Sequence, residues 1–315
     1  MRRQGLIFTI KLGLALTIIF WLYQSDVLNL AVVSRLSFDS LTIKLICLSS
    51  LLLFCGAMLI SVRIWLLLRL LELNLLLPDT MRINLAAMGM GMMLPGQLGV
   101  DAIRVTYFCI QRPDRKMRVV SAVVFDRILG VYALLLLATI ATLCAFAIDL
   151  DVIHINIATF LILALALVTG AILIFSSRAV RASQPFNTIY LRLPSMFKNI
   201  IEALDLFNNH KKAVFLCISI SIASQLITIL GFVIMGILIQ DTLPVLAHFI
   251  INPIALLLNG VPLTPGGLGI TESAFAYLYL AADSQNGAVI SLLGRLNQYL
   301  VYAIIGIPAL FLIRR

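Results

Sequence analysis

Long apolar runs separated by short polar segments make up most of this chain. A run of roughly 20 apolar residues is long enough to cross the hydrocarbon core of a bilayer as a helix. Such runs predict membrane-spanning helices at 5–23, 41–62, 119–147, 155–176, 213–239 and 286–312. Two further apolar regions, 81–111 and 245–282, contain Pro and Gly clusters that a regular helix excludes. The pattern predicts an all-α integral membrane protein, a polytopic helical bundle that forms a single transmembrane domain over residues 1–315.

The composition supports a membrane location. The chain of 315 residues is 62% hydrophobic and 12% charged, with a mean hydropathy of +1.08. A soluble domain is about half apolar and about a quarter charged, so no segment is left for a sizeable soluble domain. The five cysteines lack metal-type spacing and lie in or near apolar segments, so we expect inert thiols, no metal site and no cofactor.

Each interrupted region carries the same short motif. Leu94-Pro95-Gly96-Gln97-Leu98-Gly99 and Thr264-Pro265-Gly266-Gly267-Leu268-Gly269 both contain Pro-Gly-x-Leu-Gly. At the same offset along the chain, Tyr107 matches Tyr277, and a Val-Tyr-Ala triplet recurs further on. Several matches on one offset indicate an internal duplication. We predict repeat 1 at about 1–147 and repeat 2 at about 155–312.

The distribution of Lys and Arg predicts the orientation of the chain, because cytoplasmic loops are enriched in these residues. Most of the 23 basic residues lie in 2–3, 63–82, 104–118, 178–212 and 314–315. The intervening segments 24–44, 148–154, 240–244 and 283–285 are mainly acidic. We therefore predict a multi-pass protein of the bacterial cytoplasmic (inner) membrane, with both termini and the basic loop 177–212 in the cytoplasm. Within that loop, 195–207 has helical apolar spacing and predicts a short helix on the inner surface.

This orientation makes each interrupted region a re-entrant hairpin. Cytoplasmic charge flanks 83–103 on both sides, whereas predicted external loops flank 245–282, so the two hairpins enter from opposite faces. Inverted repeats with broken helices that meet near mid-membrane are typical of secondary transporters. The alternative is that each hairpin is a pair of tilted full spans.

A helix is expected to restart after each Pro-Gly turn, with Asp101 and Thr271 as the N-caps. Helix N-termini carry partial positive charge and free N–H groups. Two of them that face a shared centre favour an anionic ligand.

Several charged side chains lie within predicted membrane segments, among them Asp126, Arg127, Glu272 and Arg295. Such a residue costs about 2.5–3.5 kcal/mol on insertion scales and usually faces a partner or a cavity. One interpretation is structural, with Asp126 or Glu272 neutralising Arg127 or Arg295. The other is that the two arginines hold a phosphate, with Asp101 and Glu272 as counter-charges or proton carriers. On the functional interpretation, the candidate substrate-binding residues are Pro95, Gly96, Gly99, Asp101, Arg104, Asp126, Arg127, Pro265, Gly266, Gly267, Gly269, Glu272 and Arg295.

Other chemistry has less support. The sequence has no nucleophile elbow, zinc spacing, phosphate-binding glycine loop or nucleotide fold, so we predict no catalytic residues and no enzyme activity. The net charge of +9 does not indicate nucleic-acid binding, because the basic residues lie in predicted membrane loops. Among the histidines, His248 lies in the second hairpin, where we expect it to be packed rather than reactive.

Three ordered motifs resemble those of a known family. They are Leu94-Pro95-Gly96-x-x-Gly99-x-Asp101-x-x-Arg104, then Asp126-Arg127-x-x-Gly130, then Pro262-x-x-Pro265-Gly266-Gly267-x-Gly269-x-x-Glu272. Through them, nearly the whole chain resembles the flippase-like transmembrane domain of lysylphosphatidylglycerol synthases, which also occurs as a standalone protein. The resemblance implies a domain that moves a lipid between leaflets.

The chain departs from the family pattern at Gln97 and Val100, where further glycines are expected, and at Thr271, where an arginine often precedes the glutamate. These departures leave the lipid head group open. The sequence contains no soluble aminoacyl-transferase domain, so we do not expect this chain to synthesise a lysyl-lipid.

The first functional hypothesis is a flippase-like transporter of an anionic phospholipid or a lipid-linked (polyprenyl-phosphate) sugar. Its head group would pass between the hairpin tips, with Arg127 and Arg295 on the phosphate. The second is a non-transporting accessory subunit for a glycosyltransferase or another lipid-modifying enzyme. The third is an exporter of a small soluble anion. The expected partners are membrane lipids and, on the second hypothesis, the enzyme.

Overall fold

The computed structural model is an all-α bundle. It describes residues 13, 16–24, 33, 36, 39–91, 94, 96–148, 161–162, 164–165, 168–169, 210–260, 264 and 267–313. The main helices are α3 (Ser40–Leu70), α4 (Leu77–Gly91), α5 (Gly96–Gln111), η1 (Pro113–Arg115), α6 (Lys116–Ala147), α11 (Lys211–Leu238), α12 (Val245–Leu258), α13 (Ile270–Leu280) and α14 (Gly287–Phe311). These residues include no strand, which confirms the predicted fold class. Most of the predicted spans 5–23 and 155–176, and nearly all of the loop 177–212 with its 195–207 helix, lie outside the described residues.

Four helices in the described part of the chain are long and apolar enough to cross a membrane: α3, α11, α14, and α6 together with η1. They match the predicted spans at 41–62, 119–147, 213–239 and 286–312. α3 begins where the Asp39 carboxylate accepts a hydrogen bond from the Thr42 backbone N–H at 2.9 Å. This hydrogen bond lowers the pKa of Asp39. The helix then continues through Arg63 to Leu70.

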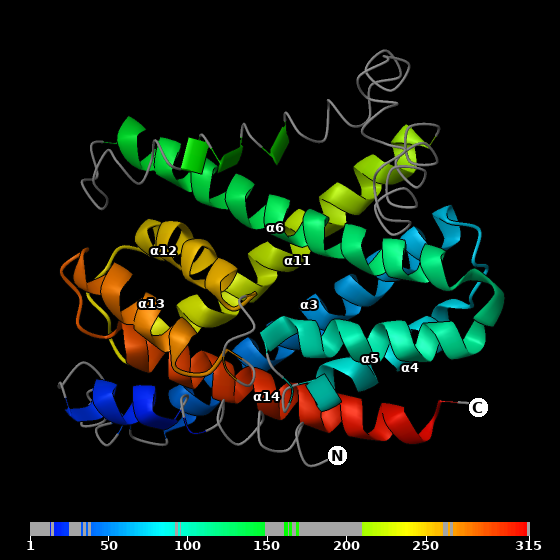
Figure 1. The fold of residues 1–315 in the computed structure, drawn as a ribbon. Coiled ribbons are helices and arrows are strands. Elements are labelled where there is room, and N and C mark those ends of the chain that lie inside the picture. The colour runs from blue at the N-terminus through cyan, green and yellow to red at the C-terminus, as the bar shows by residue number, and fades with distance from the viewer. Residues whose placement is uncertain are drawn as a thin grey trace.

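The interrupted regions form two helical hairpins, α4 with α5 and α12 with α13. The four helices have 11 to 16 residues. At 1.5 Å per residue they are about 16–24 Å long, which is shorter than a hydrocarbon core of about 30 Å. Figure 1 shows the first hairpin on the right of the bundle and the second on the left. These lengths favour re-entrant hairpins over pairs of full spans.

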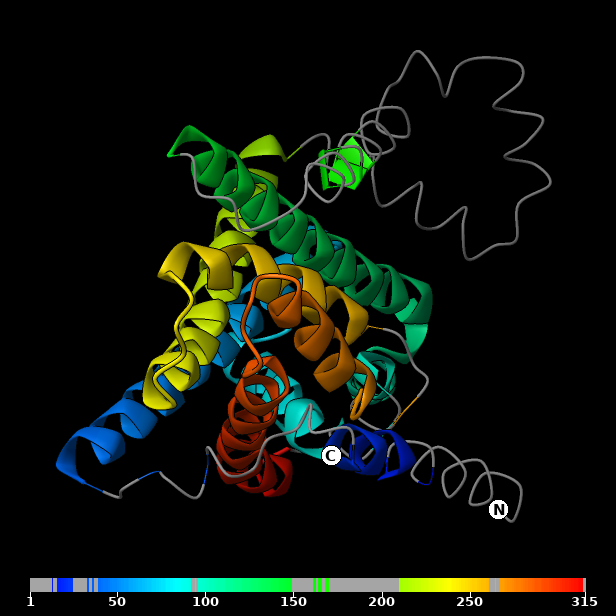
Figure 2. The ribbon, with the colours of Figure 1, turned by 90° about the vertical axis from the view of Figure 1, so that its left-hand side faces the viewer.

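The helix contacts of the two halves correspond. α3 packs against α11, α4 packs against α14, and α12, the counterpart of α4, packs against α6. Seen from the left-hand end of Figure 1, α6 and α14 lie on either side of the second hairpin (Figure 2). Two related units that pack around a twofold axis give this correspondence. The repeat limits at 1–147 and 155–312 remain a prediction.

Small residues let the helices approach closely, as is common in membranes. A Cβ atom added at Gly306 of α14 would lie 2.5 Å from the Leu85 carbonyl oxygen and 2.8 Å from the Gly89 Cα atom, both in α4. Where α3 meets α11, the Ser49 hydroxyl donates to the Gly231 carbonyl at 3.0 Å. The backbones therefore form part of these contacts.

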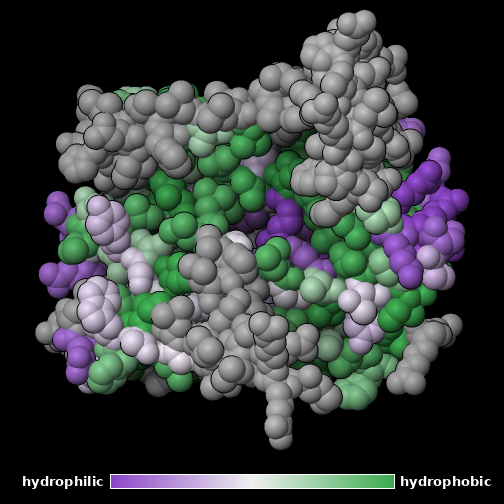
Figure 3. Space-filling view, viewed as in Figure 1, coloured by the Kyte–Doolittle hydropathy of each residue, from purple (hydrophilic) through white to green (hydrophobic). Residues whose placement is uncertain are grey.

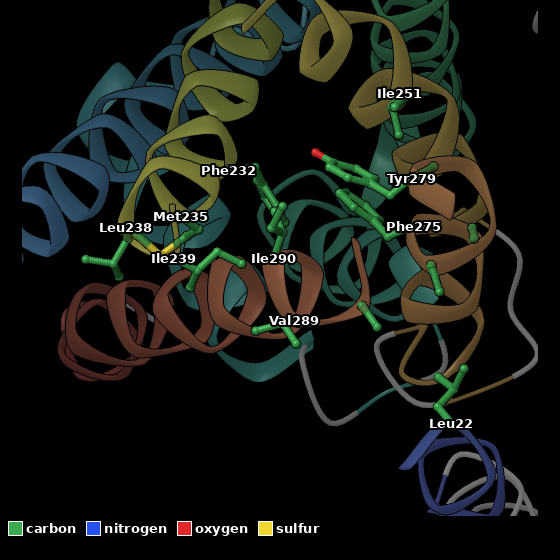
Figure 4. Close-up of a cluster of buried hydrophobic side chains, with 14 of the residues drawn as sticks. Leu22, Phe232, Met235, Leu238, Ile239, Ile251, Phe275, Tyr279, Val289 and Ile290 are labelled. Atoms are coloured by element: carbon green, nitrogen blue, oxygen red, sulfur yellow. The ribbon is translucent and has the colours of Figure 1, made fainter. Parts of the chain in front are cut away.

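Aromatic rings join the second hairpin to α11. The ring of Phe232 in α11 stacks on Phe275 of α13 with a centroid distance of 5.7 Å, and Phe275 stacks on Tyr279 at 5.9 Å. Figure 4 shows the three rings in the apolar cluster between α11, α13 and α14. The stack positions α13 from its buried side.

Basic side chains gather at the end of the bundle where the first hairpin enters. Three arginines there donate to backbone carbonyls of the α3–α4 connection: Arg112, Arg115 and Arg118. The Glu72 carboxylate accepts from Arg118 at 2.6 Å, and this ion pair lowers the pKa of Glu72. At the opposite end, the connections 239–244 and 281–286 contain acidic residues but no Lys or Arg. The predicted orientation requires basic residues at one end of the bundle and acidic residues at the other. It would put the basic end in the cytoplasm.

The predicted N-caps are wrong at both hairpins. α5 begins at Gly96, so Asp101 lies inside the helix, where it pairs with arginines. α13 begins after Gly269, the N-cap at φ 86°, and Thr271 lies buried in its first turn. Because glycine adopts this positive φ without a Cβ clash, the helix begins before the polar residue that resembles a cap.

We expect Gly306→Ala to lower the melting temperature of the detergent-solubilised protein, because the added methyl group would meet the α4 backbone. Overpacking of this kind costs about 1–3 kcal/mol. Gly130→Ala in α6 is the matched control: it brings the same gain in helix propensity, but the added Cβ atom would lie 3.7 Å from its nearest neighbour outside the helix, Nε2 of Gln225. Equal melting temperatures in the two variants would contradict the close contact between α4 and α14.

Candidate functional site

A buried network of charged side chains ties the first hairpin to the bundle. Its centre is Asp126 of α6, whose side chain is 3% exposed. One carboxylate oxygen accepts from Nε of Arg63 in α3 at 2.7 Å, and the other accepts from Arg104 in α5 at 3.2 Å. Charge-assisted hydrogen bonds are roughly twice as strong as neutral ones. A single carboxylate therefore links three helices.

Asp101 extends the network along α5. It accepts from Arg104, one turn further along the helix, at 3.3 Å, and from Nε of Arg127 in α6. Arg127 also donates to the backbone carbonyl of Gln97 at 2.7 Å. Its side chain is 32% exposed, whereas that of Arg104 is 6% exposed. Arg127 is therefore the member of the network that an incoming group can reach.

The second hairpin contributes its own ion pair. Oε2 of Glu272 accepts the Gly269 backbone N–H at 2.6 Å, which holds the carboxylate at the start of α13. Oε1 lies 3.5 Å from a guanidinium nitrogen of Arg295 in α14. Arg295 also donates to the Gly267 carbonyl at 3.2 Å and to the Tyr299 hydroxyl at 2.6 Å. One arginine thus anchors the start of α13 to α14.

The two sets of charges face one cavity of about 170 Å³ between the hairpins. The lining residues recur every three to four positions along each long helix, as one helix face requires. On α6 they are Asp126, Arg127, Gly130, Val131 and Leu134, and on α14 they are Arg295, Gln298, Tyr299 and Tyr302. The hairpin tips contribute Gly91, Gln97, Asn259 and Gly260. Figure 3 shows polar side chains in a recess on a largely apolar face.

The cavity is electropositive. The arginines that line it are Arg63, Arg104, Arg127 and Arg295, and Asp126 is the one carboxylate among the lining residues. When Asp101 and Glu272 behind them are included, four positive charges oppose three negative ones. Nε of Arg104 is buried and has no hydrogen-bond partner within the described chain. The arrangement can therefore accept an anion, whereas no group of His, Cys, Asp and Glu in the described residues is placed to hold a metal ion.

The sequence as a whole matches the lysylphosphatidylglycerol synthase TM region over residues 8–306. The chain belongs to that family. No curated protein matches it. The family match confirms the resemblance drawn from the Pro-Gly and Asp-Arg motifs. It also describes a transmembrane region rather than a catalytic domain, which is compatible with the prediction that the chain is not an enzyme.

In this member of the lysylphosphatidylglycerol synthase TM-region family, the motif residues converge on the cavity. The predicted site residues that line it are Arg104, Asp126, Arg127 and Arg295, while Asp101 and Glu272 bind these arginines. Gly99 is a packing position, since a Cβ atom there would lie 2.2 Å from Cβ of Leu94. Gly267 and Gly269 form the turn before α13, both at positive φ. Gly96 begins α5, and Pro95, Pro265 and Gly266 lie outside the described residues.

The ion pairs agree with the structural interpretation only in part. Glu272 pairs with Arg295, as one predicted combination required. Asp126 and Arg127, however, each pair with a residue of α5. Adjacent residues on a helix point in different directions, so this carboxylate and this arginine do not face each other. The two residues extend the network to different parts of the first hairpin.

Arg63 is the main site residue that the sequence analysis missed. Together with Arg104, it was counted among the cytoplasmic charges, yet both side chains are buried. The available signal was the apolar run that continues on both sides of Arg63. The neutral polar residues Gln225, Gln298 and Asn259 also line the cavity, and no motif marks them.

We expect Asp126→Ala to destabilise the protein strongly, because it leaves Arg63 and Arg104 buried without their shared carboxylate. Breaking a buried ion pair from one side costs about 3–5 kcal/mol. The control is Asp79→Ala, since Asp79 pairs with Arg82 at 3.1 Å where both side chains are about one-third exposed. Such a surface pair is worth about 0–1 kcal/mol. Thermal unfolding in detergent measures both variants, and similar losses would count against Asp126 as the centre of the network.

Proposed function

We propose that this chain translocates a phosphate-bearing lipid between membrane leaflets, with the head group in the cavity between the hairpins. The observation that carries the proposal is the convergence of four arginines on a cavity that both hairpins line. Guanidinium groups bind phosphate oxygens through paired, charge-assisted hydrogen bonds. Membership of the lysylphosphatidylglycerol synthase TM-region family supports a role in lipid handling.

The charge balance favours a head group with one negative charge. The site has one excess positive charge, and a phosphodiester would neutralise it. Anionic phospholipids and polyprenyl-phosphate sugars both contain such a group. The neutral polar residues of the lining, among them Gln225, Gln298 and Asn259, suit the hydroxyl groups of glycerol or a sugar.

The surroundings of Arg127 favour a lipid over a soluble anion. Leu98 lies one residue after Gln97, which binds Arg127, and Val131 lies one turn after Arg127 in α6. The two apolar side chains are 52% and 41% exposed. Exposed apolar surface beside a polar recess is typical of a membrane interaction site. A lipid bound here would keep its acyl chains against these residues while its head group reaches the arginines.

Arg295 provides a link between head-group binding and movement of the second hairpin. Its guanidinium group binds Glu272 and the Gly267 carbonyl, and it also lines the cavity. A phosphate that binds Arg295 competes with these contacts. Head-group binding would therefore loosen the anchor at the start of α13 and allow the turn to move.

Two other functions would use the same cavity. An accessory subunit for a glycosyltransferase or another lipid-modifying enzyme would bind the lipid without transferring it. An exporter would move a small soluble anion instead. The inner-membrane location and the cytoplasmic termini belong to the proposal in each case.

We expect the purified protein in proteoliposomes to transfer a fluorescent phosphodiester lipid between leaflets. Arg127→Gln or Arg295→Gln is expected to lower the initial rate about tenfold or more, because a hydrogen bond to a charged group contributes about 1.5–3 kcal/mol and about 1.4 kcal/mol corresponds to tenfold in rate. Chemical quenching of the fluorophores in the outer leaflet measures the transfer.

Arg82→Gln is the control for this experiment, since Arg82 belongs to the partly exposed pair outside the cavity. It should retain the wild-type rate. Lipid binding by folded wild-type protein without transfer would favour the accessory subunit. Uptake of labelled phosphate without lipid transfer would favour the exporter, and either result would contradict the proposal.

The charge balance has a separate test. Glu272→Gln raises the excess from one positive charge to two, while the amide oxygen can still accept from Gly269. We expect this variant to favour phosphatidic acid, a phosphomonoester, over phosphatidylglycerol by about tenfold more than wild type, which corresponds to roughly 1.4 kcal/mol. Native mass spectrometry of lipid-bound protein measures the preference, and an unchanged ratio would contradict the charge argument.

A further inference from the structure

A second buried polar cluster lies in the second hairpin, apart from the cavity. It consists of Asp241 in the α11–α12 connection, His248 and Asn252 on α12, and Tyr279 on α13. None of the four lines the cavity described above. The side chains of His248 and Asp241 are 3% and 0% exposed. The cluster is therefore a separate group of titratable side chains in an apolar setting.

The hydrogen bonds form a chain across α12 and α13. The Tyr279 hydroxyl donates to Oδ1 of Asn252 at 2.8 Å, and Nδ1 of His248 lies 2.6 Å from the Tyr279 oxygen. On the other side of the imidazole, Nε2 lies 3.7 Å from Oδ2 of Asp241. The chain therefore ends on a carboxylate.

The cluster has more hydrogen-bond acceptors than hydrogens to donate to them. The Tyr279 hydrogen is given to Asn252, so Nδ1 of His248 must carry a hydrogen in order to bind the Tyr279 oxygen. A neutral imidazole then presents the lone pair of Nε2 to Asp241. Oδ2 of Asp241 is buried and has no hydrogen-bond partner among the described residues. Two acceptors face each other, and one further proton would relieve their repulsion.

A rotation of the Asn252 amide would give a second arrangement, in which the imidazole hydrogen lies on the other ring nitrogen. The Nδ2 atom of Asn252 has no partner in the described chain, and rotation would let it donate to the Tyr279 oxygen. The Tyr279 hydrogen would then bond to Nδ1 of His248, and the imidazole hydrogen would move to Nε2, facing Asp241. In the first arrangement a further proton is required between His248 and Asp241, whereas in the second the imidazole hydrogen itself lies there. The structure has the first arrangement, in which Oδ1 of Asn252 accepts from Tyr279. Switching between the two moves a hydrogen along the chain.

We propose that Asp241, His248 and Tyr279 form a binding site for a transferable proton, held between the Asp241 carboxylate and the His248 imidazole. Oδ1 of Asp241 accepts from Ser284 at 2.6 Å and from Asn286 at 2.9 Å, both just before α14. The proton would therefore enter from the end of the bundle formed by the 239–244 and 281–286 connections. That end is opposite the basic one.

In the described part of the chain, the helices around His248 bring no further titratable group into contact with the imidazole. On α11, Gly236 meets the imidazole so closely that a Cβ atom there would lie 2.9 Å from its Cε1 atom. α6 packs against α12 through apolar residues such as Leu134, Phe249 and Leu257. Within the described residues, Asp241 and Tyr279 are the titratable side chains in contact with His248.

The proton site is placed to act on the lipid site. Tyr279 and Glu272 lie on the same helix, α13, about two turns apart. The proton links His248 of α12 to Asp241 in the α11–α12 connection. Loss of the proton would therefore weaken the contacts that fix this end of the second hairpin. We therefore assign the proton the role of coupling ion, and this role rests on the proposed translocation, whereas proton binding does not.

The first test measures the proton directly. The chain has three histidines, so His154→Gln with His210→Gln leaves His248 as the single imidazole. Nitrogen-15 NMR of labelled histidine reports which ring nitrogens are protonated as the pH changes. We expect a titration between a doubly and a singly protonated ring. Asp241→Asn should move its midpoint to lower pH by about one unit or more, because it removes the paired negative charge.

Asp283→Asn is the matched control, since Asp283 is an exposed carboxylate at the same end of the bundle. It should leave the midpoint unchanged. A ring that stays in one neutral tautomer from about pH 5 to about pH 9, the range in which histidine ordinarily titrates, would overturn the proposal. An unchanged midpoint in Asp241→Asn would also overturn it. If Asp241→Asn does not fold, the titration of the parent protein decides.

The second test addresses coupling in proteoliposomes that transfer lipid. A gradient of about one pH unit is expected to change the wild-type rate by up to about tenfold, and His248→Gln should remove this dependence. A wild-type rate that does not change with the pH gradient would contradict the coupling role, but it would not contradict the proposed translocation. If no variant transfers lipid, the proposed translocation fails, and the NMR titration alone decides whether the proton site exists.

Discussion

Charge buried in an apolar bundle is the constraint on which this structure depends. A buried arginine requires a carboxylate partner. In this network most of the ion pairs join an arginine on one helix to a carboxylate on another. Asp126 pairs with the buried arginines of α3 and α5, and Asp101 pairs with the arginines of α5 and α6. The first hairpin is therefore positioned by electrostatics as well as by packing. The same contacts bring Arg104 and Arg127 to the wall of the cavity.

The second hairpin is held by polar contacts at both ends. At the start of α13, Glu272 binds the Gly269 N–H and faces Arg295. Near the end of that helix, Tyr279 connects to His248, which faces Asp241. Both ends depend on groups that a ligand or a proton can engage. Under the two proposals, phosphate binding at one end or loss of the proton at the other would release the hairpin while the long helices around it stay in place.

Local sequence predicted much of the architecture. The long apolar windows located four spans, and the Pro-Gly turns located both hairpins, because span length and backbone restrictions act over short stretches of chain. The predicted N-caps failed because both helices begin earlier than the polar residues that resembled caps: α5 begins at Gly96, and the positive φ of Gly269 allows α13 to begin directly after it. Arg63 was missed because a charge near the end of an apolar window resembles a loop residue. His248 was expected to be packed, and it is, but its hydrogen bonds could not be foreseen.

The sequence by itself determined that this chain is a membrane bundle with two interrupted helices and charges in the apolar regions. It also determined the family, because the motifs are contiguous in the chain. Only the tertiary structure decided which arginine binds which carboxylate. Arg63 and Asp126 are 63 positions apart, and Arg127 and Asp101 are 26 apart. Their contact depends on how whole helices pack, and no local pattern of residues encodes that distance.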